Sequence, residues 1–449
     1  MKIAVVGAGI TGLAAGHEAA EAGADVAVYE AADRAGGRIR TSELGGQPVD
    51  EGPDAFLARV PWAVELCREL GLDRDLVSPA QRTAFVYSRG ALRALPQPSV
   101  LGVPLDFDAL AASEIVSPRG VNRARRETEM PGSPLLGDDS VGRLVRRRLG
   151  DEVADRLVDP LIGGINASRV DELSIRAAVP QLAQAASRGP SLVRELRRVA
   201  ASSPADPDAP VFYTLPGGLE RLTDELSNRL GHRLRLSSPV GDLGQLDADK
   251  VIVTVPAHAA QTLVAPLSAR AADLLGTIDY ASVALISLAF DAASVNHPMA
   301  GSGYLVPAVE GRTITACSWA SSKWGHVGSS DTGSSDTVVM RVSIGRHGDE
   351  RPLTMSDRAL LDAVREDLAF TMGIDAQPRA TRISRWPRSL PQFRPGHLEL
   401  VDEIEQSLAS DAPWLQVTGA WARGLGIAAC IHQGRQAARA SVAGGASAR

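Results

Sequence analysis

The first thirty residues alternate between short apolar runs and a longer helical stretch. Ile3 to Val6 are apolar without interruption, which is typical of a strand buried on both faces of a parallel sheet. Residues 11–22 are predicted to form a helix, with Gly23 as a left-handed cap after its last turn. Asp25 to Tyr29 predict a second strand. This order indicates the start of a nucleotide-binding α/β domain.

Three glycines at the first turn, Gly7, Gly9 and Gly12, have the spacing GxGxxG. The first allows a tight turn, the second lets a pyrophosphate approach the backbone, and the third lets the helix pack close to the sheet. The pyrophosphate would rest on the amides of the helix N-terminus. Glu30 ends the second predicted strand. Its carboxylate would accept hydrogen bonds from the adenosine ribose and repel a 2′-phosphate, which disfavours NADP.

The stretch after Glu30 contains the pattern RxGGRxxT, from Arg34 to Thr41. It resembles the second dinucleotide fingerprint of the FAD-dependent amine oxidase and desaturase superfamily. The glycine pair would let a loop pass close to the cofactor, and Arg38 would offer a guanidinium to a phosphate or to the flavin edge. The segment "VDEGPDAFL" (49–57) follows. The resemblance implies that Gly52 to Ala55 run under the isoalloxazine ring, where they line flavin and substrate.

The C-terminal region repeats the strand, glycine loop and helix order. Leu415 to Thr418 predict a strand, residues 419–426 a glycine-rich loop, and a helix is expected from about Ala428 to Ala440. A second helix N-terminus would therefore face an anion. The resemblance implies that it points at the N1/C2=O edge of the flavin, where negative charge develops on reduction.

The middle of the chain mixes helical and sheet patterns. Residues 138–182 are predicted to be helical, with a break at the two glycines of "PLIGGINAS" (160–168). The apolar run 281–290 predicts a buried strand, and 338–346 alternate as in a sheet. The Ser/Gly-rich stretch 328–337 is expected to form a loop.

Composition narrows the class of protein. The 449 residues are 44% hydrophobic and 22% charged, which indicates a globular protein with more than one domain. A net charge of −6 argues against nucleic acid as the main partner. Three widely spaced cysteines predict neither a disulfide framework nor a metal site, and they fit a reducing compartment. No signal peptide or membrane span is expected, so we predict a cytoplasmic protein and leave peripheral membrane contact open.

Nearly the whole chain resembles the oxygen-dependent porphyrinogen oxidases. The motifs "GAGITGLAA", "GGRIRT", "EGPDAFL", "LPGGLERL", "SSKW", "RWPRSLPQF" and "GLGIAACI" carry the resemblance. It implies a mixed α/β and α+β fold, in which a Rossmann-like FAD domain of the amine oxidase type is interleaved with a substrate domain of mixed sheet and helices. The expected FAD-binding segments are 1–80, 206–268 and 379–449; the expected substrate segments are 81–205, which is helical, and 269–378, which forms a sheet.

The motifs and the resemblance together supply the candidate site residues. Ala84 aligns with the family's substrate-carboxylate arginine, so Arg82 and Arg59 are the candidates for that role. Asp54 is the only carboxylate candidate for a direct role, and capping of a turn after Pro53 is the alternative. The predicted FAD-binding residues are Gly7, Gly9, Ile10, Thr11, Gly12, Glu30, Ala31, Gly37, Arg38, Gly52, Pro53, Asp54, Ala55, Val240, Trp386, Gly424, Leu425, Gly426, Ile427 and Ala428.

The resemblance also implies the reaction. A porphyrinogen would lose six electrons to FAD in three turnovers, each followed by reoxidation with O2 to hydrogen peroxide. We favour coproporphyrinogen III over protoporphyrinogen IX as substrate and expect transient contact with a downstream ferrochelatase; the oligomeric state stays open. The alternatives are an amine oxidase or a carotenoid-type desaturase on the same scaffold, and a flavin- or porphyrin-binding module without catalysis.

Overall fold

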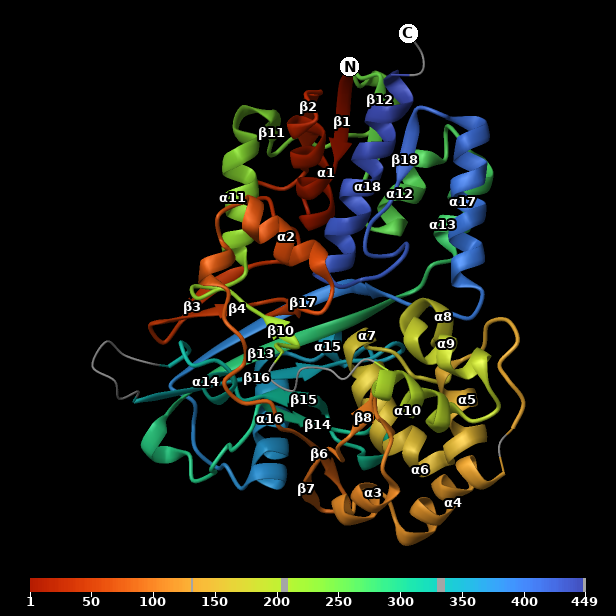
Figure 1. Ribbon diagram of the computed structural model, residues 1–449. Coiled ribbons are helices and arrows are strands. Elements are labelled where there is room, and N and C mark those ends of the chain that lie inside the picture. Colours follow the sequence, from red (N-terminus) through yellow and green to blue (C-terminus); the bar gives the residue numbers. More distant parts are fainter. Residues whose placement is uncertain (131, 203–208, 329–335, 447–449) are drawn as a thin grey trace.

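The computed structural model describes residues 1–130, 132–202, 209–328 and 336–446 (Figure 1). It has an upper lobe, which carries both ends of the chain, and a lower lobe built from a second sheet and a group of helices. The predicted mixed α/β and α+β class is confirmed. Most of the predicted loop 328–337 lies outside the described residues.

The upper lobe is built on a sheet of five parallel strands in the order β11-β2-β1-β12-β18. Segments far apart in the chain meet here, because β12 and β18 come from the middle and the end of the sequence. The strands are β1 (Lys2–Val6), β2 (Asp25–Tyr29), β11 (Leu234–Arg235), β12 (Lys250–Val253) and β18 (Leu415–Val417).

The uninterrupted apolar run of β1 is explained by burial on both faces of this sheet. Ile3 and Val5 pack into one hydrophobic core with α1, α2, α11 and α18. Ala4 and Val6 pack into another with α12, α13 and α17. The helices are α1 (Ile10–Glu21), α2 (Pro61–Glu69), α11 (Glu220–Leu230), α12 (Ala257–Val264), α13 (Ala269–Gly276), α17 (His397–Asp411) and α18 (Ile427–Ala446).

Helices α1 and α18, from opposite ends of the chain, pack side by side and run in the same direction. A Cβ atom at Gly434 would lie 2.1 Å from the carbonyl oxygen of Thr11, so only glycine allows this approach. Further along both helices, Arg435 and Arg439 each donate to Glu18 at 2.6 Å. The N-termini of the two helices therefore point to the same side of the sheet.

The lower lobe contains a seven-stranded sheet in the order β17-β13-β16-β15-β14-β6-β7, in which only β14 and β6 pair in parallel. β13 confirms the predicted buried strand 281–290. The strands are β6 (Ala84–Ser88), β7 (Ala91–Ala94), β13 (Tyr280–Asp291), β14 (Gly303–Leu305), β15 (Ile314–Ser318), β16 (Thr337–Ile344) and β17 (Ala380–Pro391).

Two predicted boundaries are wrong. The expected substrate segment 269–378 begins with α13, which packs in the upper lobe. The sequence assigned 379–449 to the FAD domain, but residues 380–391 form β17, which pairs antiparallel with β13 in the lower sheet. The long apolar strand β13 needs a partner on each side, and β17 supplies one of them. The C-terminal segment returns to the upper lobe only at α17, which packs beside β18.

A group of helices completes the lower lobe around its own hydrophobic core. The predicted break at the glycines of "PLIGGINAS" is wrong: Gly163 and Gly164 keep helical dihedral angles, and the helix continues to Asn166. Its middle turns form a π-helix, a wider register that accommodates Pro160. The helices are α3 (Phe107–Ser113), α4 (Pro118–Glu129), α5 (Val141–Leu149), α6 (Asp151–Val153), the π-helix (Ala154–Gly163), α7 (Gly164–Asn166), α8 (Ile175–Ala178), α9 (Pro180–Arg188) and α10 (Leu192–Ser202).

Short elements connect the lobes or cover the lower sheet. Three are two-stranded pairs, β3 with β4, β5 with β10 and β8 with β9. Among the described residues, no helix has the length and apolar character needed to cross a membrane. The elements are β3 (Thr41–Leu44), β4 (Gln47–Asp50), β5 (Phe56–Leu57), β8 (Ser99–Val100), β9 (Val103–Pro104), β10 (Phe212–Tyr213), α14 (Ala320–Lys323), α15 (Arg351–Thr354) and α16 (Asp357–Met372).

Changing Gly434 to alanine should destabilise the upper lobe. The new methyl group would meet the backbone of α1, which cannot move without disturbing the sheet, so we expect a loss of about 1–3 kcal/mol in the free energy of unfolding. Gly444→Ala is the matched control, because a Cβ there meets nothing within 4 Å. That change should be neutral or slightly stabilising. Urea unfolding of both variants checks this, and equal stability would contradict the close packing of α1 on α18.

Candidate active site

The first glycine loop leaves an open space in front of the N-terminus of α1. Gly7 has a φ of +102°, and a Cβ there would lie 2.9 Å from Val255. A Cβ at Gly12 would lie 1.8 Å from the carbonyl oxygen of Gly7, so turn and helix are in direct contact. A Cβ at Gly9 would meet nothing within 4 Å. The protein itself therefore does not fill the place predicted for a pyrophosphate.

Glu30 lies at one corner of this space. Its carboxylate accepts hydrogen bonds from the amides of Ala8, at 2.8 Å, and Ala32, at 2.9 Å. The amide of Ser238 donates to the carbonyl oxygen of Glu30 at 2.8 Å, which brings the segment leading to Val240 beside Glu30 and Ala31. Predicted adenosine contacts from two distant parts of the chain, 30–31 and the segment leading to Val240, thus lie at the same corner.

The second fingerprint loop packs directly on the first. The amide of Gly36 donates to the carbonyl oxygen of Ala8 at 2.8 Å, and a Cβ at Gly37 would lie 3.2 Å from the Cα of Gly9. Arg34 holds the loop closed, since its guanidinium donates to the carbonyl oxygens of Gly37 and Ile39, at 2.9 and 2.7 Å.

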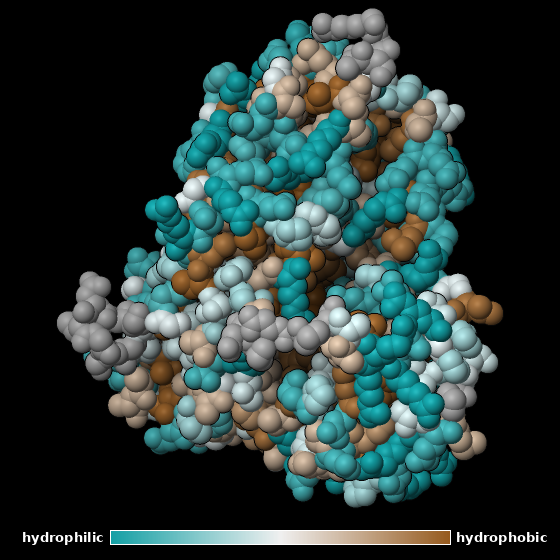
Figure 2. Space-filling view, in the orientation of Figure 1, coloured by the Kyte–Doolittle hydropathy of each residue, from teal (hydrophilic) through white to brown (hydrophobic). Residues whose placement is uncertain are grey.

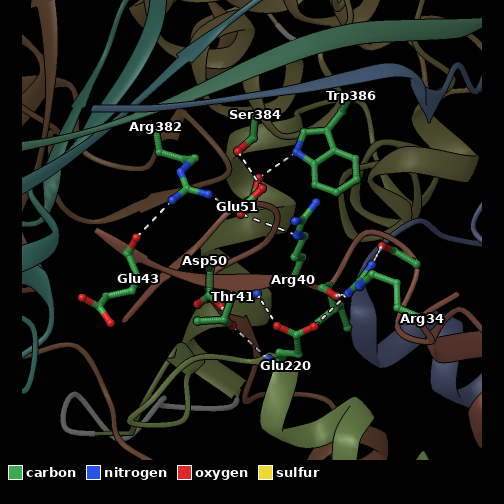
Figure 3. Close-up of polar contacts among 12 residues, drawn as sticks. Arg34, Arg40, Thr41, Glu43, Asp50, Glu51, Glu220, Arg382, Ser384 and Trp386 are labelled. Carbon is green, nitrogen blue, oxygen red and sulfur yellow. Dashed lines mark hydrogen bonds and ion pairs between the residues drawn. The ribbon is translucent and has the colours of Figure 1, made fainter. Parts of the chain in front are cut away.

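Glu220, at the start of α11, anchors this loop from the other side (Figure 3). Its carboxylate pairs with Arg34 at 2.9 Å and accepts the amide of Thr41 at 2.7 Å. Sequence reasoning missed Glu220, although it lies within the quoted motif "LPGGLERL". Its acidic position in the first turn of a helix was the available signal.

Arg38 is a half-buried cation without a carboxylate partner among the described residues. Its guanidinium donates to the carbonyl oxygen of Arg388 at 3.2 Å. Burial lowers the pKa of Arg38, and the weak acids near it, Tyr280 and Cys430, are uncharged at neutral pH because burial raises the pKa of both. A guanidinium removed from water in this way calls for an anionic ligand.

The two helix N-termini supply unpaired amides to the same region. In α1 the first helical hydrogen bond is from Leu13 to Gly9, at 2.9 Å; in α18 it is from Cys430 to Gly426, also 2.9 Å. The amides that precede these donors in the described part of each helix have no carbonyl acceptor within their own helix. Together with Arg38 they fit the pyrophosphate and the flavin edge of FAD.

The segment 51–55 is fixed from the lower sheet. Trp386 of β17 donates its indole N–H to the carbonyl oxygen of Glu51 at 2.7 Å (Figure 3). The Glu51 carboxylate accepts from Ser384 at 3.0 Å and lies 3.4 Å from Arg382 and 3.6 Å from Arg40. This predicted flavin segment is therefore bound to β17 at the junction of the lobes.

Asp54 is occupied by protein donors. Its carboxylate pairs with Lys323 and Arg341, each at 3.0 Å, and accepts from the indole of Trp324 at 3.3 Å. Burial would raise its pKa, but the charges of Lys323 and Arg341 outweigh burial and hold the pKa of Asp54 well below its usual range. A carboxylate in this state exchanges no proton near neutral pH. The geometry favours holding of the loop over a direct role in the reaction.

Other candidate residues lie outside these loops. Arg59, between β5 and α2, and Arg82, just before β6, both have exposed side chains.

Burial raises the pKa of the Cys430 thiol to about 11, so it is uncharged at neutral pH. Among the described residues, no cluster of His, Cys, Asp and Glu could hold a metal ion.

Figure 2 shows a hollow between the upper and lower lobes, with a hydrophobic floor. Exposed apolar side chains occur on the short pair β5–β10, where Leu57, 46% exposed, lies opposite Phe212, 37% exposed. Figure 1 places β10 at the same level, between the lobes. A flat apolar substrate could enter the molecule there.

Residues 10–441 match the family model of the flavin containing amine oxidoreductases. The chain belongs to this family. Its cofactor is therefore FAD, and the glycine loops, the paired helix N-termini and the unpaired Arg38 are suited to hold it.

The resemblance to the porphyrinogen oxidases is also confirmed. The chain is 36% identical over 444 residues to coproporphyrinogen III oxidase of Mycobacterium tuberculosis, covering 95% of this chain and 94% of the relative. It is 33% identical over 460 residues to coproporphyrinogen III oxidase of Bacillus subtilis, covering 97% and 96%. A provisionally named protoporphyrinogen oxidase from Exiguobacterium sp. 255-15 superposes with a TM-score of 0.86 at 27% identity, covering 98% of both chains.

Gly9→Leu should abolish retention of FAD without unfolding the protein. The backbone at Gly9 has φ −69° and ψ 174°, which leucine can adopt, and the side chain would occupy the open space. We expect FAD to bind about 100-fold more weakly, which corresponds to about 3 kcal/mol. The ratio of flavin to protein absorbance after gel filtration measures this. Gly444→Leu is the control, and full retention of flavin by Gly9→Leu would show that the loop is misassigned.

Asp50→Asn should stabilise the protein above pH 6. Burial raises the pKa of Asp50 to about 6, so wild-type stability should fall as the pH rises from about 4 to 6 and stay lower above it. Asparagine keeps an acceptor for the Thr41 hydroxyl and the Leu219 amide, at 2.6 and 3.0 Å. We expect a gain of about 2–3 kcal/mol at pH 8 and none at pH 4. Unfolding curves at both pH values test this, with Asp375→Asn, at an exposed position, as the control.

Proposed function

We propose that this chain oxidises coproporphyrinogen III to coproporphyrin III, with FAD as cofactor and O2 as the terminal electron acceptor. The similarity to enzymes of that name over more than nine-tenths of both chains is the observation that carries the proposal. The apolar hollow between the lobes supports it, because the substrate is a large macrocycle with an apolar body.

The cofactor roles proposed for individual residues follow the geometry of the cradle. The amides of residues 9–12 and the Arg38 guanidinium would hold the pyrophosphate, and Glu30, Ala31 and Val240 the adenosine. Residues 52–55, the indole of Trp386 and the loop 424–428 would surround the flavin ring.

When bound, FAD supplies a hydride acceptor, and three turnovers with three O2 convert one porphyrinogen into one porphyrin and three H2O2. The protein needs to orient the macrocycle. It needs no strong base, because the electron-rich ring can lose its N–H protons to solvent. The ionised Asp54 agrees with this mechanism. Its carboxylate forms ion pairs with Lys323 and Arg341 and does not exchange protons. Arg59 and Arg82 stay the proposed partners of the substrate carboxylates.

Protoporphyrinogen IX is the second candidate substrate. The chain is 27% identical over 471 residues to protoporphyrinogen oxidase 1 of Arabidopsis thaliana, covering 95% of this chain and 85% of the relative. The two substrates differ by two carboxylates, so cations at the mouth of the hollow would decide between them. Transient contact with a ferrochelatase and peripheral contact with a membrane stay predictions.

An aerobic assay with each porphyrinogen tests the proposal. We expect porphyrin fluorescence to rise faster with coproporphyrinogen III, with three H2O2 formed per porphyrin. Without air, the flavin should bleach on addition of substrate and regain its colour when O2 is admitted. Equal rates with both substrates would refute the preference, and a flavin that stays oxidised with both would refute the activity.

Acid precipitation should release the FAD, since the neutral Cys430 thiol is a poor nucleophile.

A further inference from the structure

His397 is a buried histidine that contacts the backbone just before the loop 424–428, which we expect beside the flavin. It is the first residue of α17, and its ring stacks on Phe393 with centroids 4.4 Å apart. Its Nε2 atom lies 2.9 Å from the carbonyl oxygens of both Trp421 and Ala422. Because carbonyl oxygens only accept, Nε2 carries a proton and donates to both. One side chain thus fixes two consecutive peptide groups just before the glycine loop.

Gln433 of α18 binds the peptide group that joins Ala422 to Arg423 and the peptide group that follows Gly424. Its amide oxygen accepts the amide of Arg423 at 2.9 Å, and its amide nitrogen donates to the carbonyl oxygen of Gly424 at 3.0 Å. Gln433 is buried, like His397. Between them, these two side chains bind the carbonyl oxygens of residues 421, 422 and 424.

The direction of these carbonyl groups decides which charge the loop presents. With the three oxygens bound to protein donors, the amides from Gly424 to Ala429 have no acceptor in the described structure. A released carbonyl could turn toward the cofactor and place a partial negative charge where the amides now offer a positive one. We infer that His397 is a cofactor-positioning residue, which together with Gln433 keeps the loop before α18 electropositive toward the flavin.

The position of His397 is itself set by the helical part of the lower lobe. The amide of Gly396 donates to the Asp138 carboxylate at 2.9 Å, and the amide of Ser174 donates to the carbonyl oxygen of Phe393 at 2.6 Å. Residues 393–397 are therefore bound by the helices of the lower lobe. Through His397 they in turn bind the loop before α18. The same segment therefore connects the helices of the lower lobe to the loop that we expect beside the flavin.

Two substitutions at His397 separate the hydrogen bond that its Nε2 donates from the packing of its ring on Phe393. His397→Phe keeps the aromatic ring against Phe393 but removes the donor, whereas His397→Gln keeps an N–H near the position of Nε2. Gln433→Leu removes the second donor independently. We expect His397→Phe and Gln433→Leu to weaken FAD binding about tenfold and to shift the flavin reduction potential to more negative values, because charge on the reduced flavin loses stabilisation. His397→Gln should restore both properties.

The holoenzymes are compared by dye-coupled potentiometry and by flavin release on dilution, with melting temperatures measured in parallel. Arg423→Ala is the control, because among the described residues that side chain pairs with Asp402 and Glu405 alone, on the surface of α17. The inference is overturned if the donor-free variants keep the wild-type potential and affinity, even at a lower melting temperature. It is also overturned if His397→Gln fails as His397→Phe does. Neither outcome depends on which porphyrinogen is oxidised, so the inference stands or falls separately from the proposed function.

Discussion

The structure depends on one electrostatic constraint: a set of positive groups that have no anionic partner among the described residues. The amides at the N-termini of α1 and α18 and the half-buried guanidinium of Arg38 meet beside the glycine loops. In water each group would be solvated, so gathering them in a cradle is favourable only with a bound anion. FAD supplies that anion along its pyrophosphate and on its reduced ring. Binding of FAD would therefore stabilise the fold of the upper lobe.

Most charged residues around the cradle hold loops in place. Arg34 and Glu220 close the second fingerprint loop, and the ion pairs of Asp54 hold the segment expected under the flavin. Because these charges are partly buried and paired, they fix the geometry of the loops. This suits an oxidation in which the cofactor carries out the chemistry and the protein contributes orientation.

The two lobes are joined through residues that contact both. Trp386 lies on the lower sheet and holds Glu51, which belongs to the upper loops. The segment 393–397 is bound to the helical part below and, through His397, to the loop before α18 above. A substrate between the lobes would therefore border on the residues that orient the cofactor.

The sequence alone determined the local elements that carry a strong period or a turn requirement. The strand, glycine loop and helix at each end, the acid at Glu30 and the buried strand β13 were predictable, because each depends on residues close in the chain. Only the tertiary structure decided that residues 380–391 join the lower sheet, that the π-helix runs through Gly163, and that Asp54 meets Lys323 and Arg341. The pairing of β17 with β13 and the ion pairs of Asp54 join residues far apart in the chain, and a single sequence carries no local pattern for such pairings.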